Sequence, residues 1–168
     1  MIYIIRHQVG SSDSNCLNKQ GLCNINKIAT RFSNNKNNVL LRSIYTLNPS
    51  AYKHIRPIQT ASTLVTLLND NFLVLTCNAY EDVINDVNKY AHKYDIIIVW
   101  HHGEIPDMLR HIAFVFNLDQ PSNFSWPDDN YNGCLLVDTQ KHTWAFRPNY
   151  FNNIFFLNYF FRKIPCIG

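Results

Sequence analysis

Basic side chains follow two of the most apolar segments of the sequence, and their types could attack or bind an anion. Arg6 and His7 come directly after an apolar run at the N-terminus, and His101 and His102 come directly after the run 96–100. A neutral imidazole nitrogen is a competent nucleophile near neutral pH. A planar guanidinium matches the oxygens of a phosphate group with paired donors. Nucleophilic attack by an imidazole and binding of an anion by arginine are therefore the chemistry that these residues suggest.

Alternating strands and helices are expected to position these side chains. Apolar runs predict strands at 2–5, 40–46, 72–76 and 95–100, and apolar residues at helical spacing predict helices at 22–32, 58–68, 80–94 and 105–116. Two further short runs, 134–138 and 143–147, predict a hairpin at a sheet edge. This order indicates an α/β fold, a three-layer α/β/α sandwich with a mostly parallel central sheet. Ligands of such sheets bind beyond the carboxyl ends of the strands, where both basic pairs are expected.

Size and composition limit the classes of partner. The chain has 168 residues, 46% of them hydrophobic, and we expect a single domain over residues 1–168. The net charge of +3 is small and dispersed, so no nucleic-acid partner is expected. The apolar stretches are too short for a bilayer core of about 30 Å, so no membrane partner is expected either. The aromatic tail 150–161 is expected to pack on the domain or to form the contact of a homodimer.

The cysteines give no sign of a framework. There are five of them, scattered along the chain and without a Cys-x-x-Cys pair, so neither a disulfide framework nor a zinc site is predicted. We therefore expect reduced thiols and a cytoplasmic location. The abundance of asparagine, isoleucine and aromatic residues is typical of an AT-rich genome, such as that of a large DNA virus.

Four segments, taken together and in order, carry a resemblance to a known family. They are the stretch that ends in Arg6-His7, the stretch Leu17-Asn-Lys-Gln-Gly21, the stretch Ile44-Tyr-Thr46 followed by Arg56-Pro-Ile-Gln-Thr-Ala61, and the stretch Trp100-His-His102-Gly-Glu-Ile-Pro106 with Trp126-Pro-Asp-Asp129 downstream. Over roughly residues 1 to 140 this pattern resembles the histidine phosphatase superfamily, with its phosphoglycerate mutase-like fold. The last segment is closest to a subgroup that reads Trp-x-His-x-x-Ile-Pro. Gln8 stands where the family usually has glycine.

The resemblance implies a metal-independent phosphatase. His7 would be the nucleophile that forms a phosphohistidine, Arg6 and Arg56 would bind the phosphate, and His102 would be the second catalytic histidine, also in contact with the phosphate. The substrate would be a phosphorylated small molecule or a phosphoprotein, and no cofactor is implied. The alternative is a catalytically silent relative that binds a phosphorylated ligand or partner, which Gln8 and an uncertain proton donor keep open.

The proton donor for the leaving group is the least marked part of the pattern. The chain has two glutamates, Glu81 after the third predicted strand and Glu104 two residues beyond His102. On position we prefer Glu81 as the acid, although each could instead be a helix N-terminal residue that interacts favourably with the helix dipole.

A choice between the adjacent histidines follows from strand geometry. Neighbouring residues of a strand point to opposite faces, so only one of His101 and His102 is expected to share the face of His7. The Trp-x-His-x-x-Ile-Pro pattern selects His102 and leaves His101 as a wall of the site. By the same argument, the pair is not expected to form a metal site, because no third ligand is placed.

Overall fold

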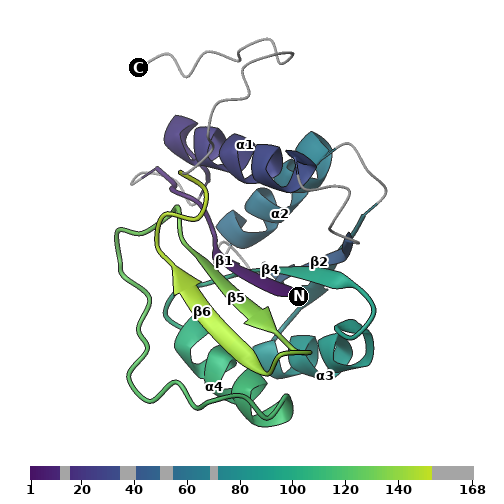
Figure 1. Ribbon diagram of the computed structural model, residues 1–168. Coiled ribbons are helices and arrows are strands. Elements are labelled where there is room, and N and C mark those ends of the chain that lie inside the picture. The colour runs from purple at the N-terminus through teal and green to yellow at the C-terminus, as the bar shows by residue number, and fades with distance from the viewer. Residues whose placement is uncertain (12–15, 35–40, 50–54, 69–71, 153–168) are drawn as a thin grey trace.

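The computed structural model describes residues 1–11, 16–34, 41–49, 55–68 and 72–152 (Figure 1). Within these ranges strands and helices alternate along most of the chain, as the sequence predicts. The elements are β1 (Ile2–Arg6), α1 (Lys19–Asn34), β2 (Leu41–Leu47), α2 (Ile55–Leu68), β3 (Leu73–Cys77), α3 (Tyr80–Tyr90), β4 (Asp95–Trp100), α4 (Ile105–Val115), β5 (Cys134–Asp138) and β6 (Thr143–Arg147).

The strands form one six-stranded sheet in the order β3-β2-β4-β1-β5-β6. The pairs β1–β4, β2–β4 and β2–β3 are parallel, whereas β5 runs antiparallel to both β1 and β6. The expected hairpin at a sheet edge is therefore present as β5 and β6. Because β1 and β4 are parallel neighbours at the centre, their carboxyl ends meet at the same edge of the sheet.

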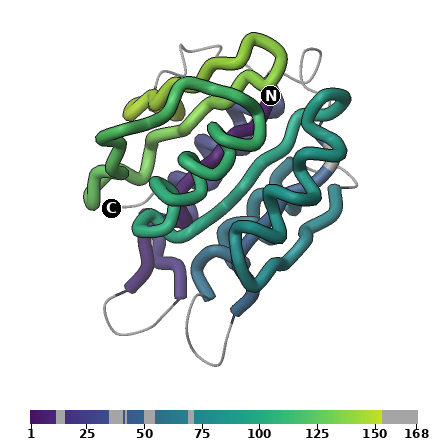
Figure 2. Tube along the Cα trace, turned by 90° about the horizontal axis from the view of Figure 1, so that it is seen from below, coloured from purple at the N-terminus to yellow at the C-terminus, as the bar shows by residue number. Residues whose placement is uncertain are grey.

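Helices cover both faces of the sheet, which gives the three expected layers. Helices α1 and α2 lie on one face and α3 and α4 on the other (Figures 1 and 2). Successive residues of β1 alternate between the two resulting cores: Ile2 and Ile4 pack on the side of α3 and α4, and Tyr3 and Ile5 on the side of α1 and α2. A central strand buried on both faces reads as a continuous apolar run, which is why β1 and β4 were identifiable from sequence.

The helices begin and end close to the expected positions, with one exception. Helix α4 has Pro106 in its first turn. Proline is tolerated there because a backbone N–H at this position would have no partner within the helix. Helix α3 ends at Tyr90 rather than at Tyr94 as expected, because residues 91–94 form a turn in which the backbone amides of Lys93 and Tyr94 both bond to the carbonyl of Tyr90.

The start of the aromatic tail packs on the domain. Phe151 is completely buried, its ring centroid lies 6.2 Å from that of Phe32, and the guanidinium of Arg31 lies over the ring of Tyr150. The rest of the tail, 153–168, lies outside the described residues. Within the described ranges, none of the helices is long and apolar enough to span a membrane.

The cysteines depart from expectation at one position. Cys77 and Cys134 are thiols outside any disulfide, as expected, but Cys23 is disulfide-bonded. The expectation of reduced cysteines is therefore wrong for Cys23. Sequence spacing could not show this, because pairing depends on which segments the fold brings together.

Candidate active site

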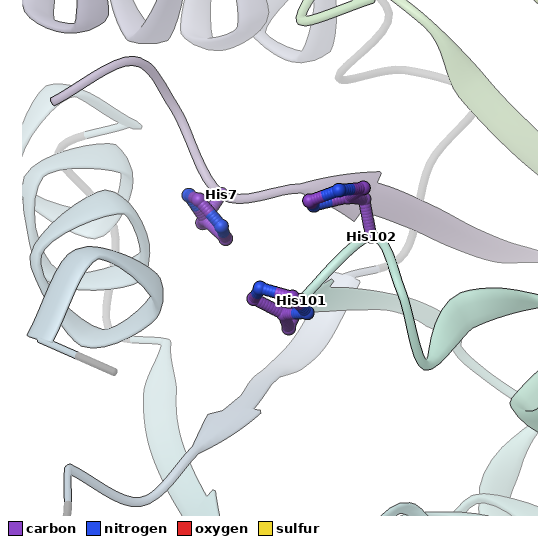
Figure 3. A group of neighbouring side chains, drawn as sticks. All are labelled: His7, His101 and His102. Carbon is purple, nitrogen blue, oxygen red and sulfur yellow. The ribbon is translucent and has the colours of Figure 1, made fainter. Parts of the chain in front are cut away.

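The central strands bring the two basic pairs together. The register pairs Arg6 with Trp100, so His7 and His101 are the first residues beyond the two strand ends. The amide of His7 still donates to the carbonyl of Trp100 at 3.0 Å, which holds the two chain segments side by side at this point. His7, His101 and His102 then converge at the edge of the sheet (Figure 3).

His7 is held as a neutral imidazole with a defined orientation. Its side chain is buried, with 5% of the residue exposed, and Nδ1 lies 3.2 Å from the carbonyl oxygen of Gln8. Because a carbonyl only accepts hydrogen bonds, Nδ1 carries the proton and the lone pair is on Nε2. Burial lowers the pKa of His7 to about 3, and the charges of Arg6, His101 and Arg56 act in the same direction. His7 therefore presents a nucleophilic nitrogen at neutral pH.

Both adjacent histidines lie close to His7. The ring centroids of His101 and His102 are 5.5 and 6.4 Å from that of His7, and 4.7 Å from each other. Both rings therefore approach that of His7, whereas strand geometry alone predicts that only one of them does so. Strand β4 ends at Trp100 and the turn that leads into α4 begins at His102, so the ring of His102 approaches His7 although this residue follows the opposite side of the strand.

The sheet register nevertheless gives the site two sides. Ile5 and Val99 pair in the register and belong to the core under α1 and α2, so His7 and His101 continue that side. Arg6 and Trp100 pair on the side of α3 and α4. The register thus makes His101, rather than His102, the counterpart of His7.

The side that begins at Arg6 is closed by the segment before β5. The Nη1 of Arg6 donates to the carbonyl oxygens of Asp128 and, at 3.5 Å, Pro127, and Nη2 donates to the hydroxyl of Tyr131 at 2.9 Å. The guanidinium carbon also lies 3.9 Å from the centre of the Tyr131 ring. Its Nε is buried without a hydrogen-bond partner among the described residues. Arg6 therefore binds this segment through Nη1 and Nη2. Of its three guanidinium nitrogens, Nε is the one that remains for contact with a ligand.

His102 belongs to the same side as Arg6. Its Nε2 lies 3.3 Å from a carboxylate oxygen of Asp128, a side chain that is 93% exposed. Its Nδ1 is buried and has no partner among the described residues. Burial and the positive charge of Arg6 lower the pKa of His102, and Asp128 opposes that shift.

Arg56 approaches from the first turn of α2. Its Nη2 donates to the carbonyl of Ser11 at 3.4 Å, and its guanidinium packs against Gly10. A β-carbon on Gly10 would lie 2.2 Å from Nε of Arg56 and 2.7 Å from the backbone carbonyl oxygen of Cys16, so this position requires glycine. The positive charge of Arg56 contributes to the lowered pKa of His7.

Gln8 has a structural role that sequence reasoning did not supply. It is 1% exposed, its amide group donates to the carbonyls of Arg6 and Tyr131, and its backbone amide donates to the hydroxyl of Thr60. Gln8 thus fastens the end of β1 both to α2 and to the segment before β5. Because its side chain is directed into these contacts, it does not take the position of a ligand above His7.

The two glutamates are placed differently. Glu104 precedes α4 and accepts a hydrogen bond from Nε1 of Trp100 at 2.8 Å, so it has a structural partner. Glu81 is exposed in the first turn of α3. The carboxylate that the structure places on the histidine cluster is Asp128. Sequence reasoning noted its Trp-Pro-Asp-Asp segment only as part of the resemblance.

The three imidazoles also have the composition of a metal site. One ligand nitrogen from each of His7, His101 and His102 lies within 4.8 Å of the others. From the sequence, no third ligand is expected beside the adjacent histidines. That expectation is wrong, because His7 lies close enough to be the third ligand.

Comparisons with known proteins agree with this fold. The chain superposes on the putative phosphohistidine phosphatase SixA from Agrobacterium tumefaciens with a TM-score of 0.54 and 16% identity, over 87% of this chain and 96% of that one. A second structure, the protein histidine phosphatase SixA complexed with tungstate, gives a TM-score of 0.54 and 13% identity over 87% and 93%. No family model matches the sequence, and no curated protein matches it significantly. The fold is that of the phosphoglycerate mutase-like histidine phosphatases, as the sequence resemblance predicts.

Proposed function

We propose that the chain is a member of the histidine phosphatase superfamily and hydrolyses a phosphomonoester, without a metal, through a phosphohistidine on His7. The observation that carries the proposal is the state of His7. It is buried and neutral, its Nδ1 proton is bonded to Gln8, and its Nε2 lone pair is left for a phosphorus atom beside two arginines.

The reaction takes two displacements. In the first, Nε2 of His7 forms a bond to phosphorus while the phosphorus–oxygen bond to the leaving group breaks, and the leaving oxygen takes a proton. In the second, water attacks the phosphohistidine, inorganic phosphate departs and the imidazole is regenerated. Arg56, Arg6 and the imidazoles of His101 and His102 stabilise the charge on the three equatorial oxygens.

The substrate class follows from the site and from the neighbours in fold. We infer a phosphorylated small molecule or a phosphoprotein. The two SixA structures are of protein phosphatases, which favours a phosphoprotein. The cytoplasmic location and a homodimer stay predictions.

The second candidate function is binding of a phosphorylated ligand without turnover. The engagement of Arg6 favours it, because two arms of its guanidinium are bonded to the segment before β5 rather than directed together at the space above His7. Such a protein would bind phosphate, vanadate or tungstate and release no phosphate from esters.

The deciding experiment is hydrolysis of an aryl phosphate with a chelator present, together with trapping of the intermediate. The wild-type protein should hydrolyse the ester, and alkaline quenching should trap an acid-labile phosphate on His7, because phosphohistidine survives alkali. Turnover by His7→Ala should be at least about a thousandfold lower than that of the wild type. His92 lies in the exposed turn after α3, and turnover by His92→Ala should equal that of the wild type. Label on serine or cysteine, or full activity in His7→Ala, would refute the proposal.

A further inference from the structure

We propose that His7, His101 and His102 bind one Zn²⁺ ion, and that this ion inhibits the phosphatase by occupying the lone pair of its nucleophile. The binding part does not depend on the proposed function, whereas the inhibition part rests on it. Imidazole nitrogens are common ligands of zinc, and three of them from one protein form a typical zinc ligand set.

Hydrogen bonds outside the cluster prepare two of the three ligands. The Nδ1 of His7 is bonded to the carbonyl of Gln8, which leaves a lone pair on Nε2. The Nε2 of His102 faces the Asp128 carboxylate at 3.3 Å, and the neutral ring then carries its lone pair on Nδ1, the atom that is buried without a partner. A carboxylate behind a histidine ligand fixes the ring and raises its basicity.

His101 completes the set from the neighbouring position. Its Nδ1 accepts a long hydrogen bond of 3.3 Å from the amide of Gly103, a contact weak enough to give way to a metal–nitrogen bond. One ring nitrogen from each histidine lies within 4.8 Å of one from each of the others. A tetrahedral zinc ion with bonds of about 2.0–2.1 Å needs separations of about 3.4 Å. Rotation of the side chains of His101 and His102, which lie beyond the end of β4, can supply this contraction.

The same ion excludes phosphoryl transfer. A metal bound at Nε2 of His7 takes the electron pair that would attack phosphorus, so no N–P bond can form while the ion is present. A zinc ion at this position should therefore abolish turnover reversibly. A chelator should restore it, in keeping with a reaction that itself uses no metal.

Direct binding is the first test, and it uses the whole chain without any substrate. Titration with Zn²⁺ should give one site per chain. His7→Ala, His101→Ala and His102→Ala should each weaken binding more than the roughly 10–100-fold expected for Asp128→Asn, which removes only an outer partner. His92→Ala is the matched control and should bind as the wild type does. Circular dichroism establishes that each variant is folded, and His101→Gln replaces His101→Ala if it is not.

Co²⁺ identifies the ligands. It should show visible absorption of a tetrahedral ion with nitrogen ligands and no thiolate charge-transfer band, because none of the expected ligands is a cysteine. A thiolate band, a wild-type chain that does not bind zinc, or unchanged affinity in folded His101 and His102 variants would overturn the metal site.

Activity then separates this inference from the proposed function. The zinc concentration for half-inhibition of aryl phosphate hydrolysis should match the directly measured dissociation constant, and EDTA should reverse the inhibition. Hydrolysis by a chain that binds no zinc would overturn the metal site alone. Zinc binding by a chain that hydrolyses nothing would uphold the site and overturn both the proposed function and the inhibition.

Discussion

The two sides of the candidate active site are prepared to different degrees, although both begin at the end of β1. On the side of α1 and α2, His7 is buried and oriented by Gln8, and Arg56 approaches through the space that Gly10 leaves. On the side of α3 and α4, Arg6 gives two arms of its guanidinium to the segment before β5. One residue step along a strand thus separates a side chain poised for chemistry from one that mainly holds structure.

The largest effect that distinguishes the two sides should appear in the arginines. Arg56→Ala should weaken vanadate binding and turnover by a few kcal/mol, about a hundredfold to a thousandfold, as expected for loss of a preorganised charged donor. Arg6→Ala should affect vanadate less and stability more, because it releases contacts with Asp128 and Tyr131. Inhibition constants for vanadate and thermal unfolding of both variants test this. An unchanged vanadate constant in Arg56→Ala would place Arg56 outside the site.

The adjacent histidines test whether the sides act together. His101 continues the side of His7 and His102 the side of Arg6, so we expect each alanine substitution to cost about a hundredfold in turnover, the size of removing one preorganised donor. Sequence alone favoured His102 and predicted a much smaller cost for His101→Ala. Steady-state turnover of the two folded variants decides the matter: near wild-type activity in His101→Ala would show that the sequence pattern was the better guide.

This contrast marks what the sequence could and could not predict. The strands were readable because a central strand buried on both faces needs an unbroken apolar run. The strand order was not predicted, because β4 lies between β1 and β2 and no local pattern records that insertion. The convergence of His7 with His101 and His102 was predicted only in part, because the alternation argument assumed a strand where β4 has already ended. The contacts of Arg6 with Asp128 span 122 positions, and no local pattern records them.

Acid should destabilise the protein through the side of His7. Its pKa is about 3 in the folded protein and about 6.5 when unfolded, so above pH 6.5 the imidazole is neutral in both states and has no effect on stability. As the pH falls towards 3, the imidazole of His7 is protonated in the unfolded state but stays neutral in the folded state. The free energy of unfolding therefore decreases, by about 2 kcal/mol at pH 5. The pKa of His102 is lowered too, which adds to the loss.

Urea unfolding at pH 7 and pH 5 measures this loss, and His7→Asn provides the matched comparison. The variant lacks the titrating group but keeps every other carboxylate and histidine, so its stability should fall less between the two pH values. Equal losses of stability in the two proteins would mean that His7 is protonated in the folded state at pH 5. The description of His7 as a neutral nucleophile would then be wrong.

The smallest expected effect concerns the proton donor. Neither of the strand ends at the site carries a carboxyl group that could fill this role. Glu81, preferred from its position in the sequence, lies exposed at the start of α3, and Glu104 is bonded to Trp100. If Glu81 protonates the leaving oxygen, Glu81→Gln should slow an alkyl phosphate several-fold and leave an aryl phosphate nearly unchanged, because an aryl oxide departs without help. Glu104→Gln is the control: it disturbs a structural hydrogen bond, so any loss should be equal for the two substrates. Equal slowing of both substrates by Glu81→Gln would exclude Glu81 as the donor and direct the same test to Asp128, the carboxylate beside His102.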